Sequence, residues 1–355
     1  MKDNIGIICI TRHGIDIARR IKAFIPTAQI YAQSKHSDSQ EDITWFDDSA
    51  SSLTSKVFKI HSALICIFSL GAVIRLISPL LSDKKKDPAV LVIDDKANFV
   101  ISALSGHLGG ANSLSREVAN LLGAQAVITT AADVNATIAV DLLGREFNWT
   151  IENFENVTKV SAYVVNEERV GIFQDSGERG WWSGSKLPDN IILVDKIEDI
   201  RSAEFKAGII ISDRCVPYQE LIEKSVIYRP KSLVVGVGLH RDTTAEDIRK
   251  GMDDVFKEKG LALGSVRNIS SIDKNDSDGG LKKFSEEYKI PLQLYDKTLL
   301  ANVIVPNPSQ VVKKFEGIPS VSEAAAILSS GGELIIPKQI FPPNLTLAVA
   351  KIRFG

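Results

Sequence analysis

The sequence has few of the residue types and patterns that mark several common protein classes. It has three cysteines in 355 residues, Cys9, Cys66 and Cys215, and no Cys-x-x-Cys pair. Its five histidines are scattered, so no set of ligands with the spacing of a zinc site is visible. These absences argue against a disulfide-stabilised secreted domain and against a structural zinc site. We expect reduced thiols, with Cys9 and Cys66 buried in apolar strands.

Long apolar segments and an excess of positive charge are also missing. No apolar run approaches the roughly 18 residues that a membrane span needs. The apolar run at residues 5–10 is too short for the core of a signal peptide. The formal net charge of −2 provides no basic surface for nucleic acid. We therefore expect a cytoplasmic protein that binds neither nucleic acid nor membranes.

The residues that are present suit a large globular protein. Hydrophobic residues make up 44% of the chain and charged residues 24%, which is enough apolar material for more than one core. At roughly 100–200 residues per domain, the length predicts two or three domains. Changes in pattern divide the chain into an N-terminal α/β domain at 1–147, a small mixed α/β domain at 148–230 and a C-terminal α/β sandwich at 231–355.

The N-terminal region alternates short apolar runs with segments of helical spacing, which predicts a doubly wound, parallel α/β layer. The expected strands are 5–11, 28–32, 63–68, 89–93, 98–103 and 126–128, and the expected helices are 14–24, 53–60, 71–81 and 113–122. Residues 94–98 predict a hairpin-like turn. Ligands of such folds bind beyond the carboxyl ends of the strands. We therefore expect the loops after Phe68, Leu104 and Ile128 to border one cleft.

A glycine-rich turn, LSGHLGGAN at residues 104–112, joins one of these strands to the next helix. Its three glycines allow a sharp turn and a close approach of the backbone to a ligand. The start of the following helix favours an anion. His107 is the only side chain of the turn that titrates near neutral pH. A tight connection without a ligand is the plainer alternative, because the turn matches neither a dinucleotide-binding motif nor a P-loop.

The other two regions are less regular. The middle region has strand-like runs and little helix, with runs at 160–165, 169–173, 191–194 and 208–212. Its adjacent Trp181 and Trp182 could cover a flat ligand, although packing under a loop is the interpretation we favour. In the C-terminal region Thr244 and Asp247 predict a capping box. The expected helices there are 244–257, 279–288, 309–315 and 321–328, and the expected strands are 233–238, 333–336 and 345–352.

Several motifs together resemble the CbiG family. In the N-terminal region they are GAVIRLI (71–77), PLL (79–81), DPAV (87–90), FVIS (99–102), the LSGHLGGAN turn, LGAQ (122–125) and VITTAADVN (127–135). In the C-terminal region they are VGVG (235–238), TTAEDI (243–248), SSIDK (270–274), GIPSVSEAAA (317–326) and LTLAVA (345–350). The resemblance covers nearly the whole chain and is weakest in the middle region.

The resemblance implies a cobalt-precorrin-5A hydrolase of anaerobic cobalamin biosynthesis. Such an enzyme opens the δ-lactone on ring A and expels C-20 with its methyl group as acetaldehyde, which gives cobalt-precorrin-5B. It implies no cofactor of the protein's own, since cobalt arrives with the corrinoid substrate, and neighbouring pathway methyltransferases as partners. Leu239 and His240 stand where the family usually has Cys-Arg or Cys-Asn, and residues 275–278 replace an acidic pair. We therefore assign no site residue to the C-terminal half.

For this reaction His107 is the expected general base, acting through a water. The backbone N–H groups of Gly109, Gly110 and Ala111 are expected to hold an oxyanion or a carboxylate. The other expected substrate contacts are loop residues, short polar groups near strand ends and one basic residue: Arg75, Ser105, Gly106, Asn112, Thr129 and Thr130.

Some assignments have alternatives. Asp133 either orients His107 or, as we favour, caps the next helix. Lys84, Lys85 and Lys86 could add positive charge, but such a run is more typical of a solvated loop. The competing function is a non-catalytic corrinoid carrier, in which the glycine-rich turn clamps a carboxylate and His107 is only a donor. A sugar-phosphate-binding protein is disfavoured because no phosphate motif is present.

Overall fold

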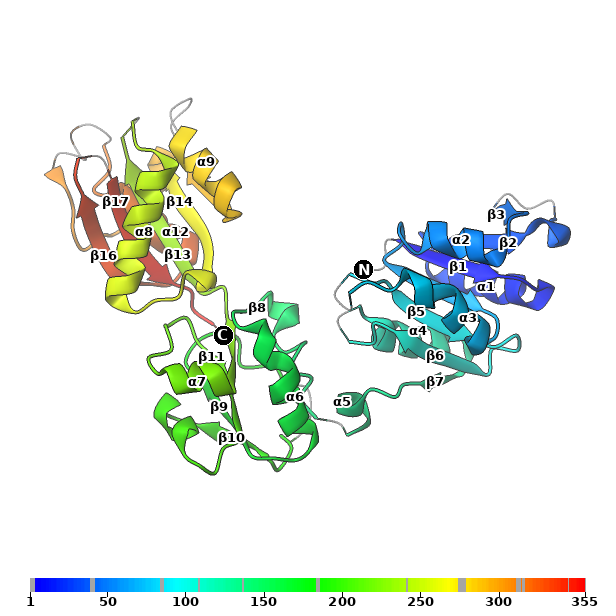
Figure 1. Ribbon diagram of the computed structural model, residues 1–355. Helices are drawn as coiled ribbons and strands as arrows, with labels where there is room; N and C mark the ends of the chain where they lie inside the picture. The colour runs from blue at the N-terminus through cyan, green and yellow to red at the C-terminus, as the bar shows by residue number, and fades with distance from the viewer. Residues whose placement is uncertain are drawn as a thin grey trace. The chain divides into compact units, whose positions relative to one another are not determined.

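The computed structural model describes residues 4–38, 42–83, 86–107, 109–135, 137–182, 186–240, 242–273, 279–310, 314, 317–343 and 345–354. They form three β-sheets, each accompanied by helices (Figure 1). The chain divides into two compact units, one up to Leu142 and the other from Leu143 onward. The first unit contains one sheet and the second contains two. Among the residues that the structure describes, no helix is long and apolar enough to cross a membrane.

The first unit is built on a seven-stranded sheet in the order β3-β2-β1-β4-β5-β6-β7. Its strands are β1 Ile5–Cys9, β2 Gln29–Gln33, β3 Ile43–Phe46, β4 Ala63–Ile67, β5 Ala89–Ile93, β6 Phe99–Leu104 and β7 Gln125–Val127. Its helices are α1 Arg12–Phe24, α2 Ala50–Val57, α3 Leu70–Ile77, α4 Ala111–Leu122 and α5 Ala131–Val134, with 3-10 turns η1 Ser34–His36 and η2 Ser78–Leu80. Apart from β3 and the short α5, the sequence predicted each strand and α-helix.

The two faces of this sheet carry separate cores. Ile7 and Ile65 point to one face and belong to a cluster with the apolar sides of α1 and α4. Ile8 and Cys66, the next residues in each strand, point to the other face and pack with α2 and α3. Burial on both faces explains why β1, β4 and β5 are almost continuously apolar. The predicted doubly wound α/β layer is confirmed.

Strand β6 runs in the opposite direction to β5. It pairs antiparallel with β5 through a hairpin, in which the Asp94 carboxylate accepts hydrogen bonds from the N–H groups of Lys96 and Phe99 at 3.0 and 2.7 Å. Strand β7 is parallel to β6, so the loops after Leu104 and after β7 lie at the same end of the strands. The loop after Phe68 lies at the opposite end of the strands, because β4 runs antiparallel to β6. The predicted cleft among all three loops is therefore wrong for Phe68.

The second unit begins with a five-stranded sheet in the order β10-β9-β11-β12-β8, parallel except for β8. Its elements are β8 Thr150–Ile151, α6 Val157–Val165, β9 Val170–Gln174, β10 Ile191–Val194, β11 Ala207–Ile211, α7 Gln219–Lys224 and β12 Ser225–Arg229, with 3-10 turns η3 Arg145–Phe147, η4 Phe154–Asn156 and η5 Ile197–Arg201. The strand predicted at 160–165 is wrong. Val157, Val160 and Val164 are buried at helical spacing on α6, so these valines form a helix face.

The two adjacent tryptophans are held by hydrogen bonds close to them in sequence. The Trp181 ring N–H donates to Oε1 of Gln174 at 2.8 Å, and the Trp182 ring N–H donates to the carbonyl of Lys186 at 3.1 Å. Each ring is thus held by a hydrogen bond to the protein, and the packing role that the sequence favoured stays a prediction.

A second five-stranded sheet follows, in the order β15-β14-β13-β17-β16. Its elements are β13 Leu233–Leu239, α8 Ala245–Lys259, η6 Leu263–Ser265, β14 Val266–Ile272, α9 Gly279–Tyr288, β15 Leu292–Tyr295, α10 Lys297–Ala301, α12 Val321–Ser330, β16 Glu333–Phe341 and β17 Leu345–Lys351. The predicted capping box is present, since Thr244 and Asp247 exchange hydrogen bonds at the start of α8. The helix predicted at 309–315 lies largely outside the described residues.

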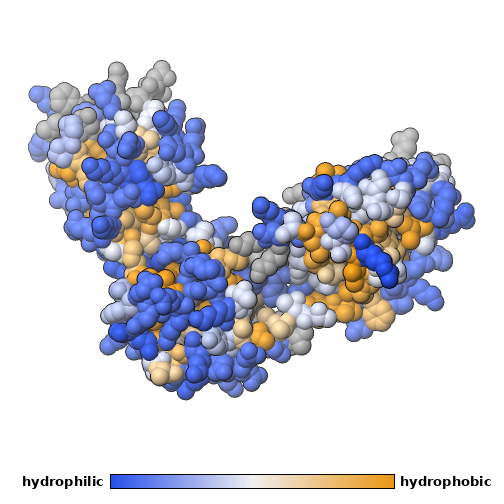
Figure 2. Space-filling view, viewed as in Figure 1, coloured by the Kyte–Doolittle hydropathy of each residue, from blue (hydrophilic) through white to orange (hydrophobic). Residues whose placement is uncertain are grey.

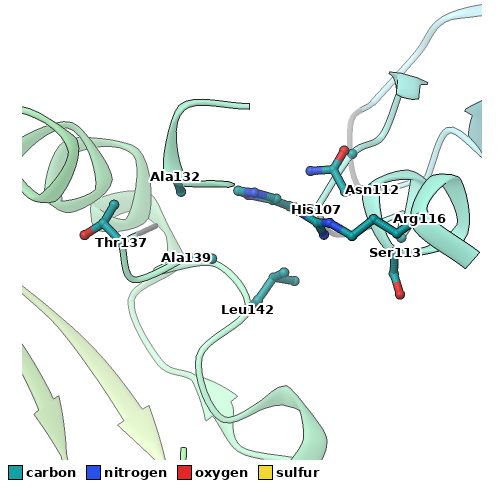
Figure 3. Close-up of a pocket in the computed structure, with 10 residues that line it drawn as sticks. His107, Asn112, Ser113, Arg116, Ala132, Thr137, Ala139 and Leu142 are labelled. Atoms are coloured by element: carbon teal, nitrogen blue, oxygen red, sulfur yellow. The ribbon is translucent and has the colours of Figure 1, made fainter. Parts of the chain in front are cut away.

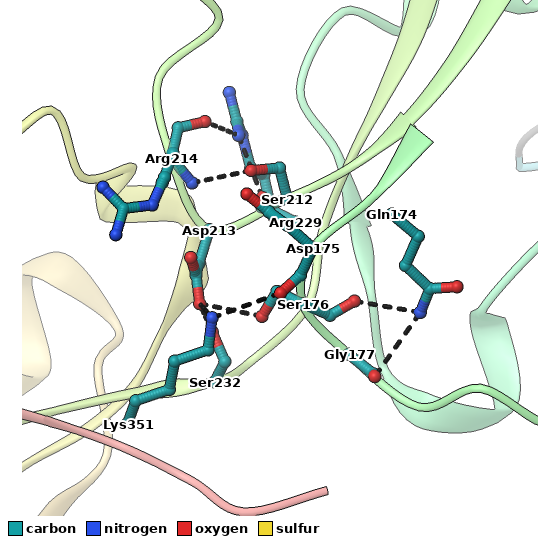
Figure 4. A network of polar contacts seen from close by, with 10 residues as sticks. All are labelled: Gln174, Asp175, Ser176, Gly177, Ser212, Asp213, Arg214, Arg229, Ser232 and Lys351. Atoms are coloured by element: carbon teal, nitrogen blue, oxygen red, sulfur yellow. Dashed lines mark hydrogen bonds and ion pairs between the residues drawn. The ribbon is translucent and has the colours of Figure 1, made fainter. Parts of the chain in front are cut away.

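A buried polar network joins the two sheets of the second unit (Figure 4). The Asp213 carboxylate, just after β11, accepts hydrogen bonds from the hydroxyls of Ser176 and Ser232 at 2.8 Å each. Lys351, at the end of β17, forms an ion pair with the same oxygen at 2.7 Å. Asp213 is 2% exposed, so these three donors replace the water that its charge would otherwise need.

Candidate active site

The glycine-rich turn connects β6 to α4 through a strained loop. Ser105 and Gly110 both have positive φ, +54° and +85°. A Cβ at Gly109 would lie 2.3 Å from the Cβ of Ser105, and one at Gly106 would lie 2.7 Å from Oδ1 of Asn112. The turn therefore needs glycine at these positions because the backbone packs against its own neighbours.

The loop caps the start of α4 with its own carbonyls. The N–H of Ala111 donates to the carbonyl of Ser105 at 3.2 Å, and the N–H of Gly110 donates to the carbonyl of His107 at 3.0 Å. The N–H of Asn112 donates to the carbonyl of Gly106 at 2.9 Å. Two of the three amides predicted to cradle an anion are thus engaged inside the loop. In this structure Gly110 and Ala111 do not present these N–H groups to a ligand.

Asn112 joins two neighbouring strands. Its side-chain carbonyl accepts a hydrogen bond from the Ser102 hydroxyl on β6 at 2.7 Å, and its amide donates to Oγ1 of Thr130 after β7 at 3.0 Å. The residue is 4% exposed. Asn112 and Thr130 were predicted substrate contacts; the structure brings them together in a bridge that holds the loop to the sheet.

A cavity of about 150 Å³ lies beside this loop (Figure 3). One wall comes from the loop and α4, and the other comes from α5 and the chain that follows it. The residues that line it are Gly106, His107, Gly110, Asn112, Ser113, Arg116, Ala132, Thr137, Ala139 and Leu142. Figure 3 shows the His107 side chain reaching from the loop toward the segment that carries Ala132. The cavity gathers His107 and three other predicted site residues within one unit.

A carboxylate contacts the His107 ring. Oδ1 of Asp141 lies 3.2 Å from Nδ1 of His107, and the exposed fractions of the two side chains are 20% and 16%. The sequence had offered Asp133 as an orienting group, but the side chain of Asp133 lies outside the described part of the structure. Asp141 is thus a site residue that sequence reasoning missed.

Arg116 is the second residue that sequence reasoning missed. It lines the cavity from α4 and lies four residues after Asn112, a spacing that places both on one side of a helix. That spacing was a usable signal, since Asn112 was already a predicted site residue. Arg116 brings a positive charge to this cavity, whereas the sequence predicted that Arg75 would be the basic contact.

Three predicted contacts lie elsewhere. Arg75 is exposed on α3, with its guanidinium 3.5 Å from the carbonyl of Gly71, and Leu70 and Ile74 of the same helix are exposed apolar residues. Figure 2 shows that apolar side chains reach the surface of the first unit. Thr129 is exposed and does not line the cavity. The Ser105 hydroxyl donates to the carbonyl of Asp87 at 3.0 Å, which ties the turn to the chain before β5. Lys84 and Lys85 lie outside the described residues.

A second histidine–carboxylate pair follows β1 and β5, at the opposite end of the strands of the same sheet. Nδ1 of His13 is 3.1 Å from Oδ2 of Asp95, and the exposed fractions of the side chains are 78% and 46%. The hydrogen bond from Thr11 is the main cause that holds the pKa of Asp95 below its usual value, and His13 adds to it. Among the described residues, no group of three or more His, Cys, Asp or Glu side chains is arranged to hold a metal ion.

Family models and curated relatives match most of the chain. Three family models match in order: cobalamin synthesis G N-terminal at 52–133, cobalamin biosynthesis central region at 138–230, and cobalamin synthesis G C-terminus at 233–350. A cobalt-precorrin-5A hydrolase from Priestia megaterium is 39% identical over 98% of this chain and 95% of its own length. One from Salmonella typhimurium is 31% identical, with coverages of 94% and 93%. A crystal structure of a cobalamin biosynthesis protein G homologue from Sulfolobus solfataricus is 24% identical, covers 99% of both chains and has a TM-score of 0.38.

Proposed function

Because the chain belongs to the CbiG family of cobalamin synthesis proteins, we propose that it is a hydrolase that converts cobalt-precorrin-5A into cobalt-precorrin-5B and acetaldehyde. The observation that carries this proposal is the match to the Priestia megaterium hydrolase, which spans nearly all of both proteins. The match covers 95% of that enzyme's length, so we propose the whole activity rather than part of it.

We propose His107 as the general base of this reaction. Its ring takes a proton from water, and the resulting hydroxide adds to the lactone carbonyl carbon. The bond between the carbonyl carbon and the lactone ring oxygen then breaks, and this oxygen, which stays on C-20 as an alkoxide, takes the proton back from the imidazolium. In the second step the base removes the proton of this hydroxyl. The bond between C-20 and the ring breaks, its electron pair stays on the macrocycle and is protonated, and acetaldehyde leaves.

The cavity is sized for one edge of the substrate. Its volume of about 150 Å³ is below the roughly 300–1,000 Å³ of a pocket that encloses a whole drug-sized ligand. A tetrapyrrole is larger still, so we propose that the lactone-bearing edge of ring A enters and the rest of the macrocycle stays outside. Arg116, which lines the cavity, would then pair with the carboxylate that lactone opening creates.

We further propose that cobalt enters with the substrate, and that the protein works in the cytoplasm beside the methyltransferases of the same pathway. The corrinoid carries several carboxylates, and these require basic contacts outside the small cavity. The exposed Arg75, among apolar side chains on α3, has the mixed apolar and basic character that suits such a contact.

The test is an anaerobic assay of acetaldehyde release from cobalt-precorrin-5A. We expect one acetaldehyde per substrate consumed by the wild-type protein. The His107→Gln variant should keep its affinity for the corrinoid and lose turnover by about 10²-fold or more, since proton transfer by a positioned base contributes that much. Binding without acetaldehyde release would indicate a carrier. Normal turnover by His107→Gln would refute the base assignment alone.

A further inference from the structure

The carboxylate beside His107 comes from a distant part of the chain and lies in a largely enclosed place. Water screens exposed ion pairs strongly and enclosed pairs much less. The His107–Asp141 and His13–Asp95 contacts have nearly the same length, 3.2 and 3.1 Å, but differ in exposure. The enclosed pair is therefore the one in which the carboxylate can control the ring.

Two apolar residues of the segment that carries Asp141 are buried. Ile138 and Val140 are 2% and 1% exposed, whereas Thr137 and Ala139 line the cavity. From Thr137 to Val140, side chains that line the cavity thus alternate with buried ones. Asp141 follows in a turn, in which the N–H of Leu142 donates to the carbonyl of Ala139 at 3.0 Å, and its carboxylate lies 3.2 Å from the His107 ring. The sequence TIAVD thus holds its carboxylate in place by burying two apolar neighbours.

His107 is held at two points. Its carbonyl accepts the N–H of Gly110, which fixes the backbone at the start of α4, and its ring contacts Asp141. A proton on Nδ1 faces the Asp141 carboxylate 3.2 Å away, which favours the neutral tautomer in which Nε2 carries the lone pair. When Nε2 takes a proton, the same carboxylate stabilises the imidazolium that forms.

We infer that Asp141 is the positioning residue of His107, fixing the tautomer and ring orientation in which Nε2 accepts the proton of the attacking water. The inference rests on the proposed function, because Asp141 acts here only through His107. It adds no bond-making step to the reaction and assigns the substrate no contact with Asp141.

The experiment measures acetaldehyde release under anaerobic conditions for the wild type, Asp141→Asn, Asp141→Glu and Asp95→Asn. Asp141→Asn should lower kcat by about 10²-fold or more, with KM changed by less than about threefold. Asp141→Glu should recover part of the loss, because it keeps a carboxylate. Asp95→Asn makes the same exchange beside the other histidine and should leave kcat unchanged.

Two readouts separate positioning from a merely structural effect. The acid limb of the pH profile of kcat/KM should move to lower pH in Asp141→Asn, because the imidazolium loses the neighbouring negative charge. In a double-mutant cycle, Asp141→Asn should cause no further loss in a His107→Gln background, because the residue that it positions is already gone.

The outcomes distinguish this inference from the proposed function. Full activity of Asp141→Asn with an unmoved acid limb, alongside an inactive His107→Gln, would overturn the inference and leave the function standing. Equal losses from Asp141→Asn in both backgrounds would also overturn it, since Asp141 would then act independently of His107. An absence of acetaldehyde from the wild type, with substrate bound, would instead overturn the proposed function.

Discussion

The three cysteines differ in what surrounds their sulfur atoms. Burial raises the pKa of the Cys9 and Cys66 thiols to about 12, whereas Cys215 is exposed. Since the thiolate is the reactive form, we expect a disulfide reagent at pH 8 to modify one thiol of the native chain rapidly, and all three after denaturation. A Cys215→Ser variant should lose the rapid reaction. Rapid modification of a second native thiol would show that a buried strand opens.

At the scale of single residues, the sequence identified His107 but not what controls it. The glycine-rich turn is a local pattern, and such a pattern can be recognised in a single sequence. Asp141 lies far along the chain in a segment without regular secondary structure, so no periodicity connects it to His107. Arg116 shares a helix face with Asn112 and was predictable from spacing. The burial of Cys9 and Cys66, predicted from apolar runs, is confirmed.

Asn112 gives a prediction at the scale of the elements that it joins. Replacing it with Ala leaves the half-buried hydroxyls of Ser102 and Thr130 without their shared partner. We expect a loss of about 1–3 kcal/mol in the free energy of unfolding, measured with urea. Ser113→Ala, at the neighbouring exposed position that also lines the cavity, should change stability by less than about 0.5 kcal/mol. Equal stabilities would favour the substrate contact that the sequence predicted for Asn112.

The direction of the elements was harder to predict than their existence. The sequence predicted a hairpin-like turn at 94–98, and a hairpin makes β6 antiparallel to β5. Treating all strands as parallel nevertheless placed the loop after Phe68 at the wrong end of the strands. The valines at 157–165 fit strand propensity, but tertiary packing makes them a helix. The capping box at Thr244 was predicted correctly because its signal lies within four residues.

At the scale of the whole molecule, the sequence predicted three α/β regions but not how the last two are joined. Lys351 ends the last strand, and its partner Asp213 follows a strand of the preceding sheet. Nothing near either residue in the sequence indicates the other. The same network contains Asp175, whose pKa is raised mainly by burial and also by the neighbouring charge of Asp213. An acid with a raised pKa makes the stability of the second unit depend on pH.

The sign of that dependence follows from the raised pKa. Below the ordinary Asp value of 3.8, Asp175 is protonated in both the folded and unfolded states and costs nothing. As the pH rises through that value, the unfolded chain loses the proton first, so folding becomes less favourable until the folded group also ionises. The cost is therefore present at pH 7. Asp175→Asn removes it and should raise the melting temperature by roughly 1–3 °C at pH 7.

The gain from Asp175→Asn should shrink as the pH is lowered toward 4, which melting curves across that range would measure. Asp189→Asn is the matched control in the same unit, because the hydrogen bond from Lys186 lowers the pKa of Asp189 instead of raising it. That exchange should give no gain at pH 7. A lower melting temperature for Asp175→Asn at pH 7 would mean that attraction to Lys351 and Arg214 outweighs burial, and that Asp175 stabilises the junction between the two sheets as a charged group.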